Sequence, residues 1–301
     1  MNDQFKIRRG RQRSETKVHD TRNRIVATFT AGAFTVRLAG PKRTFVEGTA
    51  KVSHAIWVRT YPSPFDGNVN QAWLRRALKA NSQGVPDILA IAMQYIRNAP
   101  PIHEGGLQVA GDAHYGPLKN GKRQEGSDFN DYLGIKWNYP GERFPVDKPE
   151  LRQRRCLDCS GFLRMVWGYR HNLPTSRARA SVPLCHDTRP DHSAIPRRAY
   201  QIYEGGPGVM IVPDNSIQVK NFSQIQVGDL VFFNADKTLP DGDRIDHAGI
   251  YMGRDANGRY RFISSRKSTD GPTMNDQGVR GGSALDGNGT YPGAFVAARR
   301  I

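Results

Sequence analysis

One stretch of the chain, residues 155–167, joins a compact polar cluster to an apolar helical pattern. The cluster, Asp-Cys-Ser-Gly, covers residues 158–161, and the apolar positions that follow at helical spacing are Phe162, Leu163, Met165, Val166 and Tyr169. This pattern places Cys159 in the first turn of a predicted helix. Unpaired backbone N–H groups at a helix N-terminus favour an anion, so we expect a lowered thiol pKa and a reactive thiolate at Cys159.

Three segments downstream have the composition of strands. Residues 227–233 read as a turn followed by a strand, residues 245–253 as a strand with His247 near its start, and residues 259–265 as a third strand. A cysteine on a helix N-terminus that faces a histidine on an antiparallel sheet is the arrangement of papain-like thiol hydrolases. We therefore predict Cys159 as the nucleophile and His247 as the general base. The alternatives are a small buried cysteine and a core histidine, with His114 and His186 as reserve candidates for the base.

The motifs in these segments are Asp-Cys-Ser-Gly-Phe, Val-Gly-Asp-Leu-Val-Phe-Phe and Asp-His-Ala-Gly-Ile-Tyr-Met-Gly. In this order they resemble the NlpC/P60 family of cell-wall cysteine peptidases. The resemblance covers roughly residues 86–300, and an insertion at about 174–222 lengthens the segment between cysteine and histidine. It implies an α+β protein whose papain-like catalytic domain packs the cysteine helix on an antiparallel sheet. It also implies hydrolysis of peptidoglycan stem peptides near D-glutamate and the diamino acid, with neither a metal nor an organic cofactor.

The same resemblance suggests roles for four more residues. Ser264 stands where the family often carries the residue that orients the histidine, although a water, a backbone carbonyl or Asp246 could take that role instead. Tyr115 is similar to a tyrosine that lines the substrate cleft, with a loop tyrosine packed at the surface as the alternative. Asp158 and Ser160 resemble residues that hold the free amine of a stem peptide. Capping of the helix is a second role that they can fill at the same time.

The chain has three cysteines, and an odd number does not make a disulfide framework. Cys156 and Cys159 form a C-x-x-C pair, which Cys185 and His186 could extend to a zinc site. However, an adjacent cysteine and histidine seldom bind one tetrahedral ion, and no second C-x-x-C exists. We therefore expect no metal site.

Net charge is +16 over 301 residues, which favours an anionic partner. Because Lys and Arg are spread along the chain without a nucleic-acid-binding motif, the charge does not favour a specific nucleic acid. The family resemblance implies peptidoglycan or another anionic cell-wall polymer as the partner. The sequence contains no run of about 18 apolar residues, so we expect no transmembrane helix. The N-terminus lacks the apolar stretch of a signal peptide, so no secretory signal is visible. The expected location is extracellular or cell-wall associated in a bacterium, with the cytoplasm as the alternative. The sequence does not indicate an oligomeric state.

The chain divides into three predicted parts. Residues 1–22 are polar and basic and are predicted to be a disordered arm. Residues 23–66 alternate with period two and form a β-rich region, either a binding module or a flap on the catalytic domain. Residues 67–301 form the catalytic domain, which contains helices over 72–80 and from Pro86 onward. Two rival functions remain open: thiol chemistry on a non-wall amide by a deacylase, transamidase or toxin, and an inactive basic binding module.

Overall fold

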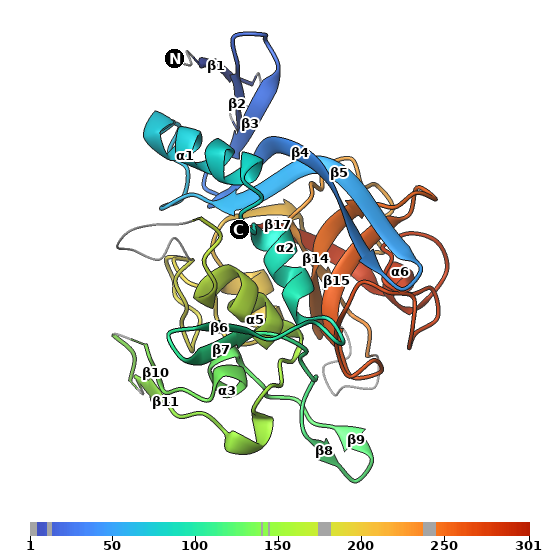
Figure 1. Cartoon of the computed structure of the whole chain (residues 1–301). Helices are drawn as coiled ribbons and strands as arrows, with labels where there is room; N and C mark the ends of the chain where they lie inside the picture. The colour runs from blue at the N-terminus through green and yellow to red at the C-terminus, as the bar shows by residue number, and fades with distance from the viewer. Residues whose placement is uncertain (1–4, 11–13, 140, 144, 174–181, 237–244) are drawn as a thin grey trace.

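The computed structural model describes residues 5–10, 14–139, 141–143, 145–173, 182–236 and 245–301. It contains two antiparallel sheets with the principal helices around and between them (Figure 1). The N-terminal sheet has the strand order β1-β2-β3-β4-β5. Its strands are β1 (Lys6–Arg9), β2 (Glu15–His19), β3 (Ile25–Thr30), β4 (Thr35–Glu47) and β5 (Ala50–Thr60).

The C-terminal sheet has the order β12-β17-β13-β14-β15-β16, and all of its neighbouring strands are antiparallel. Its strands are β12 (Val209–Val212), β13 (Leu230–Phe233), β14 (His247–Arg254), β15 (Tyr260–Arg266), β16 (Gly271–Thr273) and β17 (Phe295–Arg300). The three strand-like segments of the sequence thus supply β13, β14 and β15, which lie side by side at the centre and one flank of this sheet.

The described helices are short except for the first. They are α1 (Gln71–Ser82), α2 (Ile88–Ala92), α3 (Phe129–Leu133), α4 (Cys159–Leu163), α5 (Ala199–Gly205) and α6 (Thr290–Ala294), with 3-10 turns η1 (Met93–Tyr95) and η2 (Leu151–Gln153). The π-helix η3 (Arg164–Tyr169) continues α4 directly. Three two-stranded hairpins, β6 (Ile102–Glu104) with β7 (Leu107–Ala110), β8 (Leu118–Lys119) with β9 (Lys122–Arg123) and β10 (Trp137–Asn138) with β11 (Val146–Asp147), complete the fold. Within the described ranges, no helix has the length and apolar character that a membrane crossing requires.

The main core lies between the α4–η3 helix and the C-terminal sheet. Phe162, Leu163 and Trp167 of the helix are fully buried, as are Phe232 of β13 and Ile250 of β14. This helix was predicted from its apolar spacing alone. Its second half has π geometry, a feature that periodicity does not reveal.

A second, smaller core belongs to the N-terminal sheet. Phe29, Val36 and Leu38 of the sheet pack with Trp73 and Leu74 of α1. Because α1 covers this sheet, the N-terminal unit reaches beyond residue 66, where we had placed its boundary.

The prediction of a disordered arm over residues 1–22 is wrong for the part of this segment that the structure describes. Residues 6–9 and 15–19 form β1 and β2, and β2 pairs with β3 along its whole length. Val18 of β2 is fully buried, whereas every residue of β1 is exposed. The charged side chains of this segment lie at an outer edge and on an outer face of the sheet, where they stay in contact with solvent. A high density of charge therefore did not exclude strands in this segment.

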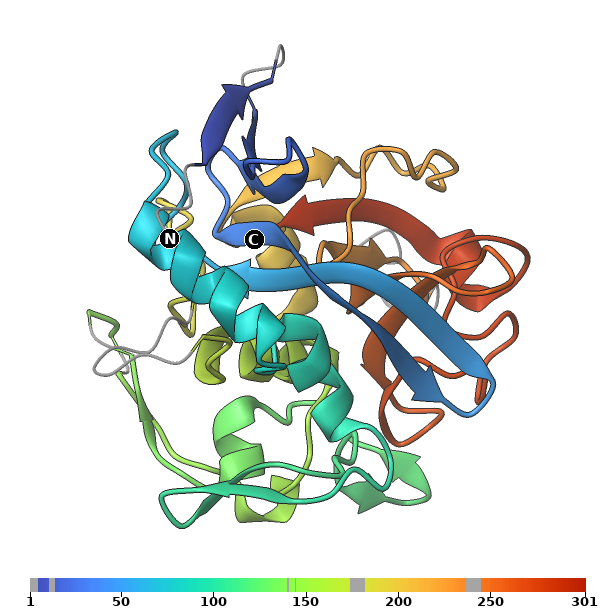
Figure 2. The ribbon, with the colours of Figure 1, turned by 45° about the horizontal axis from the view of Figure 1, so that its top comes forward.

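The N-terminal sheet is joined to the C-terminal unit by the long β4–β5 hairpin, which extends across the molecule to the C-terminal sheet (Figure 2). Glu47 near its tip accepts hydrogen bonds from Thr273 Oγ1 at 2.8 Å and from the Met274 N–H at 2.6 Å. At the other end of the hairpin, the Thr35 N–H donates to the C-terminal Ile301 carbonyl at 2.6 Å. Phe45, Val52 and other residues of the hairpin belong to the main core. These contacts tie the β4–β5 hairpin to the C-terminal unit, and the role of the N-terminal region as a binding module or a flap stays a prediction.

Candidate active site

The nucleophile candidate lies on a tightly built turn. Cys159 is the first residue of α4, and Asp158 caps the helix by accepting a hydrogen bond from the Gly161 N–H at 2.8 Å. A Cβ at Gly161 would lie 2.2 Å from the Ser127 carbonyl oxygen, so the close approach of the two segments requires glycine there. Cys159 itself is only 6% exposed.

The histidine candidate lies on the neighbouring sheet. His247 is the first residue of β14 and is paired with Phe233 of β13. Its Nε2 lies 3.0 Å from Oγ of Ser264, a fully buried residue of β15. The centroid of the Tyr291 ring lies 5.0 Å from the centroid of the imidazole, so the two rings are in contact. The residue expected by position to orient His247 is thus within hydrogen-bond distance of it.

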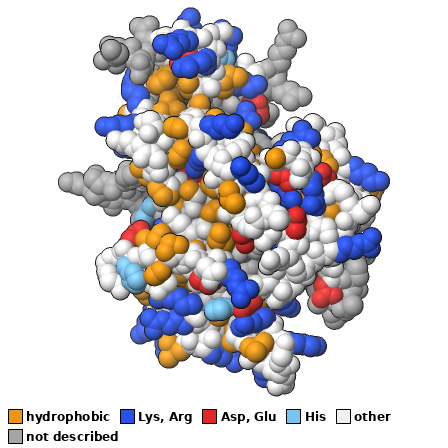
Figure 3. Space-filling model, turned by 45° about the vertical axis from the view of Figure 1, so that its right-hand side comes forward, with side chains coloured by type: hydrophobic (Ala, Val, Ile, Leu, Met, Phe, Trp, Pro, Cys, Tyr) orange, Lys and Arg blue, Asp and Glu red, His pale blue; other side chains and the backbone are white. Residues whose placement is uncertain are grey.

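A single cleft of about 970 Å³ brings most of the candidate residues together. Cys159, His247, Tyr115, Asp158 and Ser160 all line it, whereas Ser264 lies behind the histidine. Residues from the ranges 125–131, 147–150 and 197–200, together with His186, form further parts of its wall, and Lys267 and Tyr291 come from the C-terminal region. Figure 3 shows Lys and Arg dispersed over one face of the molecule rather than gathered in one basic patch.

Tyr115 is held by a polar network at the cleft. Its backbone N–H donates to Asp270 Oδ1 at 3.2 Å, and the other oxygen of Asp270 lies 2.8 Å from His114 Nδ1. His114 therefore supports the tyrosine loop, and it is not among the residues that line the cleft. Burial, with smaller contributions from Cys159 and Asp158, raises the pKa of Tyr115 well above its ordinary value. The hydroxyl is thus protonated and able to donate.

Asp158 is fully engaged by the protein. Its Oδ1 accepts from the Gly161 N–H and from Ser160 Oγ at 3.0 Å, and its Oδ2 accepts from the Gly126 N–H at 3.1 Å and from Arg197 Nη2 at 2.7 Å. Burial opposes ionisation, yet the Arg197 guanidinium and these hydrogen bonds hold the pKa of Asp158 below its ordinary value. The capping role given as an alternative is therefore present, and binding of a substrate amine stays a prediction.

The ionisation state of the candidate pair differs from our expectation. Burial and the charges of Asp158 and Glu125 raise the pKa of the Cys159 thiol, which outweighs the effect of the helix N-terminus. Burial, followed by the positive charge of Arg266, lowers the pKa of His247 from 6.5 to about 3. The expected thiolate is thus replaced at rest by a neutral thiol and a neutral imidazole. The cause is that both side chains are buried and that the charges of two carboxylates act on the sulfur.

Sequence reasoning missed Arg197 and Tyr291, two cleft residues that contact the neighbours of Cys159 and the ring of His247. Arg197 lies in the insertion, outside every motif, and its role depends on contacts that no local pattern encodes. Tyr291 lies in the glycine-rich segment 270–293, which has no helical or strand-like periodicity. The short apolar stretch 294–297 after it was the available signal that a packed element begins nearby.

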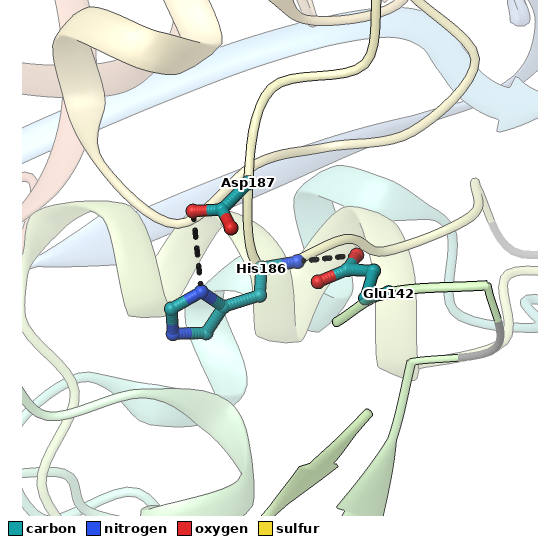
Figure 4. Close-up of side chains that lie close together, drawn as sticks. All are labelled: Glu142, His186 and Asp187. Carbon is teal, nitrogen blue, oxygen red and sulfur yellow. Dashed lines mark hydrogen bonds and ion pairs between the residues drawn. The ribbon is translucent and has the colours of Figure 1, made fainter. Parts of the chain in front are cut away.

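The structure gives no support to a zinc site made by the cysteines. All three cysteines are buried and free, and burial raises the pKa of both Cys156 and Cys185 to about 11. Among the described residues, the group with ligand atoms close enough for a metal contains Glu142, His186 and Asp187 and no cysteine (Figure 4). There His186 Nδ1 lies 3.3 Å from Asp187 Oδ1, and the His186 N–H donates to Glu142 at 2.9 Å.

Comparison with known proteins agrees with the motifs. Residues 148–275 match the model of the NlpC/P60 family, and this range contains Cys159, His247 and Ser264. No match to the chain was found among curated proteins or among solved structures. The resemblance drawn from the three motifs is thus confirmed. Members of this family are generally cysteine peptidases or amidases that act on peptidoglycan.

Proposed function

We propose that this chain, a member of the NlpC/P60 family over residues 148–275, hydrolyses an amide bond in the peptide stem of peptidoglycan. Cys159 is the nucleophile and His247 is the general base. The observation that carries the proposal is that both residues line one cleft, with His247 held by Ser264 from behind. The bond is that between D-glutamate and the diamino acid, as the family resemblance implies. The reaction takes place at the bacterial cell wall, outside the cytoplasm.

The tautomer of His247 follows from its hydrogen bond. When Nε2 carries the proton and donates to Ser264 Oγ at 3.0 Å, Nδ1 keeps a lone pair. Nδ1 is then the nitrogen that accepts the Cys159 proton. The sulfur attacks the substrate carbonyl carbon as this proton moves, and the backbone N–H of Cys159 at the helix start stabilises the oxyanion.

The second half of the reaction returns the proton. The tetrahedral intermediate collapses to a thioester when the imidazolium gives its proton to the leaving amine. His247 then removes a proton from water, the hydroxide attacks the thioester carbon, and the proton passes to the departing sulfur. Because Ser264 is neutral, it orients the ring without stabilising the imidazolium by charge.

The experiment is digestion of purified peptidoglycan by the wild type, by Cys159→Ala and by Cys156→Ala, with released fragments identified by mass spectrometry. Cys156→Ala is the matched control, because Cys156 is also buried and free but does not line the cleft. We expect stem-peptide fragments from the wild type and the control and none from Cys159→Ala.

Two other results would overturn the proposal in different ways. If the wild type releases no fragment while an iodoacetamide-type probe labels Cys159 selectively, the thiol acts on an amide outside the wall. If the probe also leaves Cys159 of the folded protein unlabelled, the chain is a binding module without thiol chemistry.

A further inference from the structure

Tyr291 packs on the imidazole of His247. It is the second residue of α6, lines the cleft and is only 6% exposed. Its ring plane is inclined by 30° to that of the imidazole, with the two centroids 5.0 Å apart, whereas the Phe233 ring is inclined by 44° at 5.8 Å. Of these two aromatic neighbours, Tyr291 is thus the closer and the more nearly parallel to the imidazole.

The ring of Tyr291 is itself held by its surroundings. The rings of Phe233 and Phe262 meet it at 67° and 78°, with centroids 5.0 Å and 5.2 Å away, so both contacts are edge to face. The guanidinium carbon of Arg266 lies 5.5 Å from the ring centroid, and Nη2 of Arg266 donates to Ser283 Oγ at 2.9 Å. Because Tyr291 would lose these contacts if it moved, it is a firm support for the imidazole.

The backbone at the start of α6 fixes where Tyr291 enters the cleft. Gly289 precedes the helix, and a Cβ at this residue would lie 2.3 Å from the Arg280 carbonyl oxygen. The Thr290 N–H donates to the same oxygen at 3.0 Å. The close approach therefore requires glycine and anchors the residue that directly precedes Tyr291.

The hydrogen bond to Ser264 restrains only part of the imidazole. It holds Nε2 of His247 3.0 Å from Ser264 Oγ. The terminal torsion of a histidine is broad and roughly two-fold, so one hydrogen bond does not by itself prevent a rotation that exchanges Nδ1 and Cδ2. A ring in contact with the imidazole opposes this rotation, because the edge of the turning imidazole would have to enter the space that Tyr291 fills.

We propose that Tyr291 is a positioning residue for the general base. Its ring holds the plane of the imidazole, so that Nδ1 stays directed to Cys159 while Nε2 donates to Ser264. The contacts that carry this role belong to the aromatic ring and not to the hydroxyl, so phenylalanine should replace the tyrosine. This inference rests on the proposed function, because it concerns the orientation of His247 in the same site.

The test compares Tyr291→Leu, Tyr291→Phe and Phe295→Leu in steady-state cleavage of a synthetic stem peptide. Phe295 is the matched control, because it is fully buried and its ring packs on Phe233 and Phe222. We expect Tyr291→Leu to lower kcat by about tenfold with a smaller change in KM, because the base is misplaced. Tyr291→Phe and Phe295→Leu should keep kcat within about twofold of the wild type.

A second measurement needs no substrate. The 15N chemical shifts of the His247 imidazole, assigned by comparison with His247→Gln, report which nitrogen carries the proton. We expect a protonated Nε2 and an unprotonated Nδ1 in the wild type and in Tyr291→Phe. In Tyr291→Leu the two shifts should move toward each other, because the freed ring exchanges between both tautomers.

The outcomes separate this inference from the proposed function. If Tyr291→Leu keeps the kcat and the 15N shifts of an active wild type, Tyr291 does not position His247, and the proposed function stands. A loss of kcat in Tyr291→Phe as large as in Tyr291→Leu also overturns the inference, because the hydroxyl would then carry the role. If the wild type cleaves no stem peptide, the proposed function fails, and the 15N shifts alone decide whether Tyr291 orients the imidazole.

Discussion

The two sides of the cleft are held by different interactions. On the nucleophile side, Asp128, Asp158, Arg164 and Arg197 form a network of ion pairs around the start of α4. On the histidine side, His247 has aromatic neighbours and one neutral hydrogen bond to Ser264. Charge fixes the position of the cysteine, whereas packing fixes that of the histidine.

This difference explains the ionisation of the candidate pair. A paired carboxylate next to the sulfur disfavours a thiolate, and burial of the ring near the positive charge of Arg266 disfavours an imidazolium. Both shifts favour the proton on the sulfur over its transfer to the imidazole. We therefore expect substitutions on the two sides to differ in how strongly they change catalysis and stability.

The largest effect is expected on the histidine side. His247→Ala removes the proposed general base, and kcat for stem-peptide cleavage should fall by about 10³–10⁴. The free energy of unfolding should fall as well, because the substitution leaves a cavity where the buried ring packs against Phe233 and Tyr291. Steady-state kinetics and urea denaturation measure the two quantities. A variant that keeps more than a tenth of wild-type kcat would remove His247 from the mechanism.

The next effect is a loss of stability on the nucleophile side. Arg164→Met leaves Asp128 buried with only the more distant Arg197, and it also strands the Cys185 and Ile195 carbonyls that Arg164 Nη1 contacts at 2.6 Å. We expect the free energy of unfolding to fall by about 3–5 kcal/mol. The matched control is Lys267→Met, which breaks the exposed Lys267–Glu125 pair and should cost less than about 1 kcal/mol. If Arg164→Met and Lys267→Met lose the same free energy of unfolding in urea denaturation, burial of the ion-pair network adds nothing to its contribution to stability.

Stability should also depend on pH through His247. Its pKa is about 3 in the folded chain against an ordinary 6.5, so as pH falls below 6.5 the unfolded chain binds the proton first. The folded state therefore loses stability between about pH 6.5 and pH 3, by at most about 1.4 kcal/mol per pH unit.

The measurement is the difference between wild type and His247→Gln in urea denaturation at pH 4, 5, 6 and 7. This difference removes the contributions of other titrating groups. We expect the variant to lose less stability than the wild type on acidification. If the free energy of unfolding falls equally with pH in the wild type and in His247→Gln, the folded and unfolded chains bind the His247 proton equally well.

A smaller effect is expected at Ser264. Ser264→Ala removes the acceptor of the His247 Nε2 proton, and kcat should fall by about tenfold because the ring loses its orientation but not its basicity. Ser265→Ala is the neighbouring control, since Ser265 Oγ donates to the Leu157 carbonyl at 2.5 Å rather than to the histidine. It should lower stability by about 1 kcal/mol. If kcat falls equally in Ser264→Ala and Ser265→Ala, the cause is a disturbance of strand β15 and not the loss of the hydrogen bond to His247.

The smallest effect concerns the thiol pKa. Glu125→Gln removes a negative charge that raises the pKa of Cys159, so iodoacetamide should alkylate the thiol faster at a given pH than in the wild type. The change should be modest, because Glu125 is exposed and its charge is screened by solvent. A slower rate would contradict the assigned sign of this interaction.

Local chemistry in the sequence was sufficient for several elements. The polar cluster 158–161, followed by apolar residues at helical spacing, was enough to place Cys159 in the first turn of a helix. The strands around Leu230, His247 and Ile263 follow from short apolar runs, and the family resemblance pointed to Ser264 on the third of them. These features depend on neighbours within a few residues, and short-range patterns record such neighbours well.

Only the tertiary structure decided the features that depend on distant partners. Arg197 meets Asp158 across 39 positions of the chain, β2 gains its place by pairing with β3 and burying Val18, and Tyr291 reaches His247 from a segment without a clear pattern. The direction of the Cys159 and His247 pKa shifts belongs to the same group. Burial and nearby charge set these shifts, and both exist only once helix α4 has packed on the C-terminal sheet and the segments that line the cleft have come together.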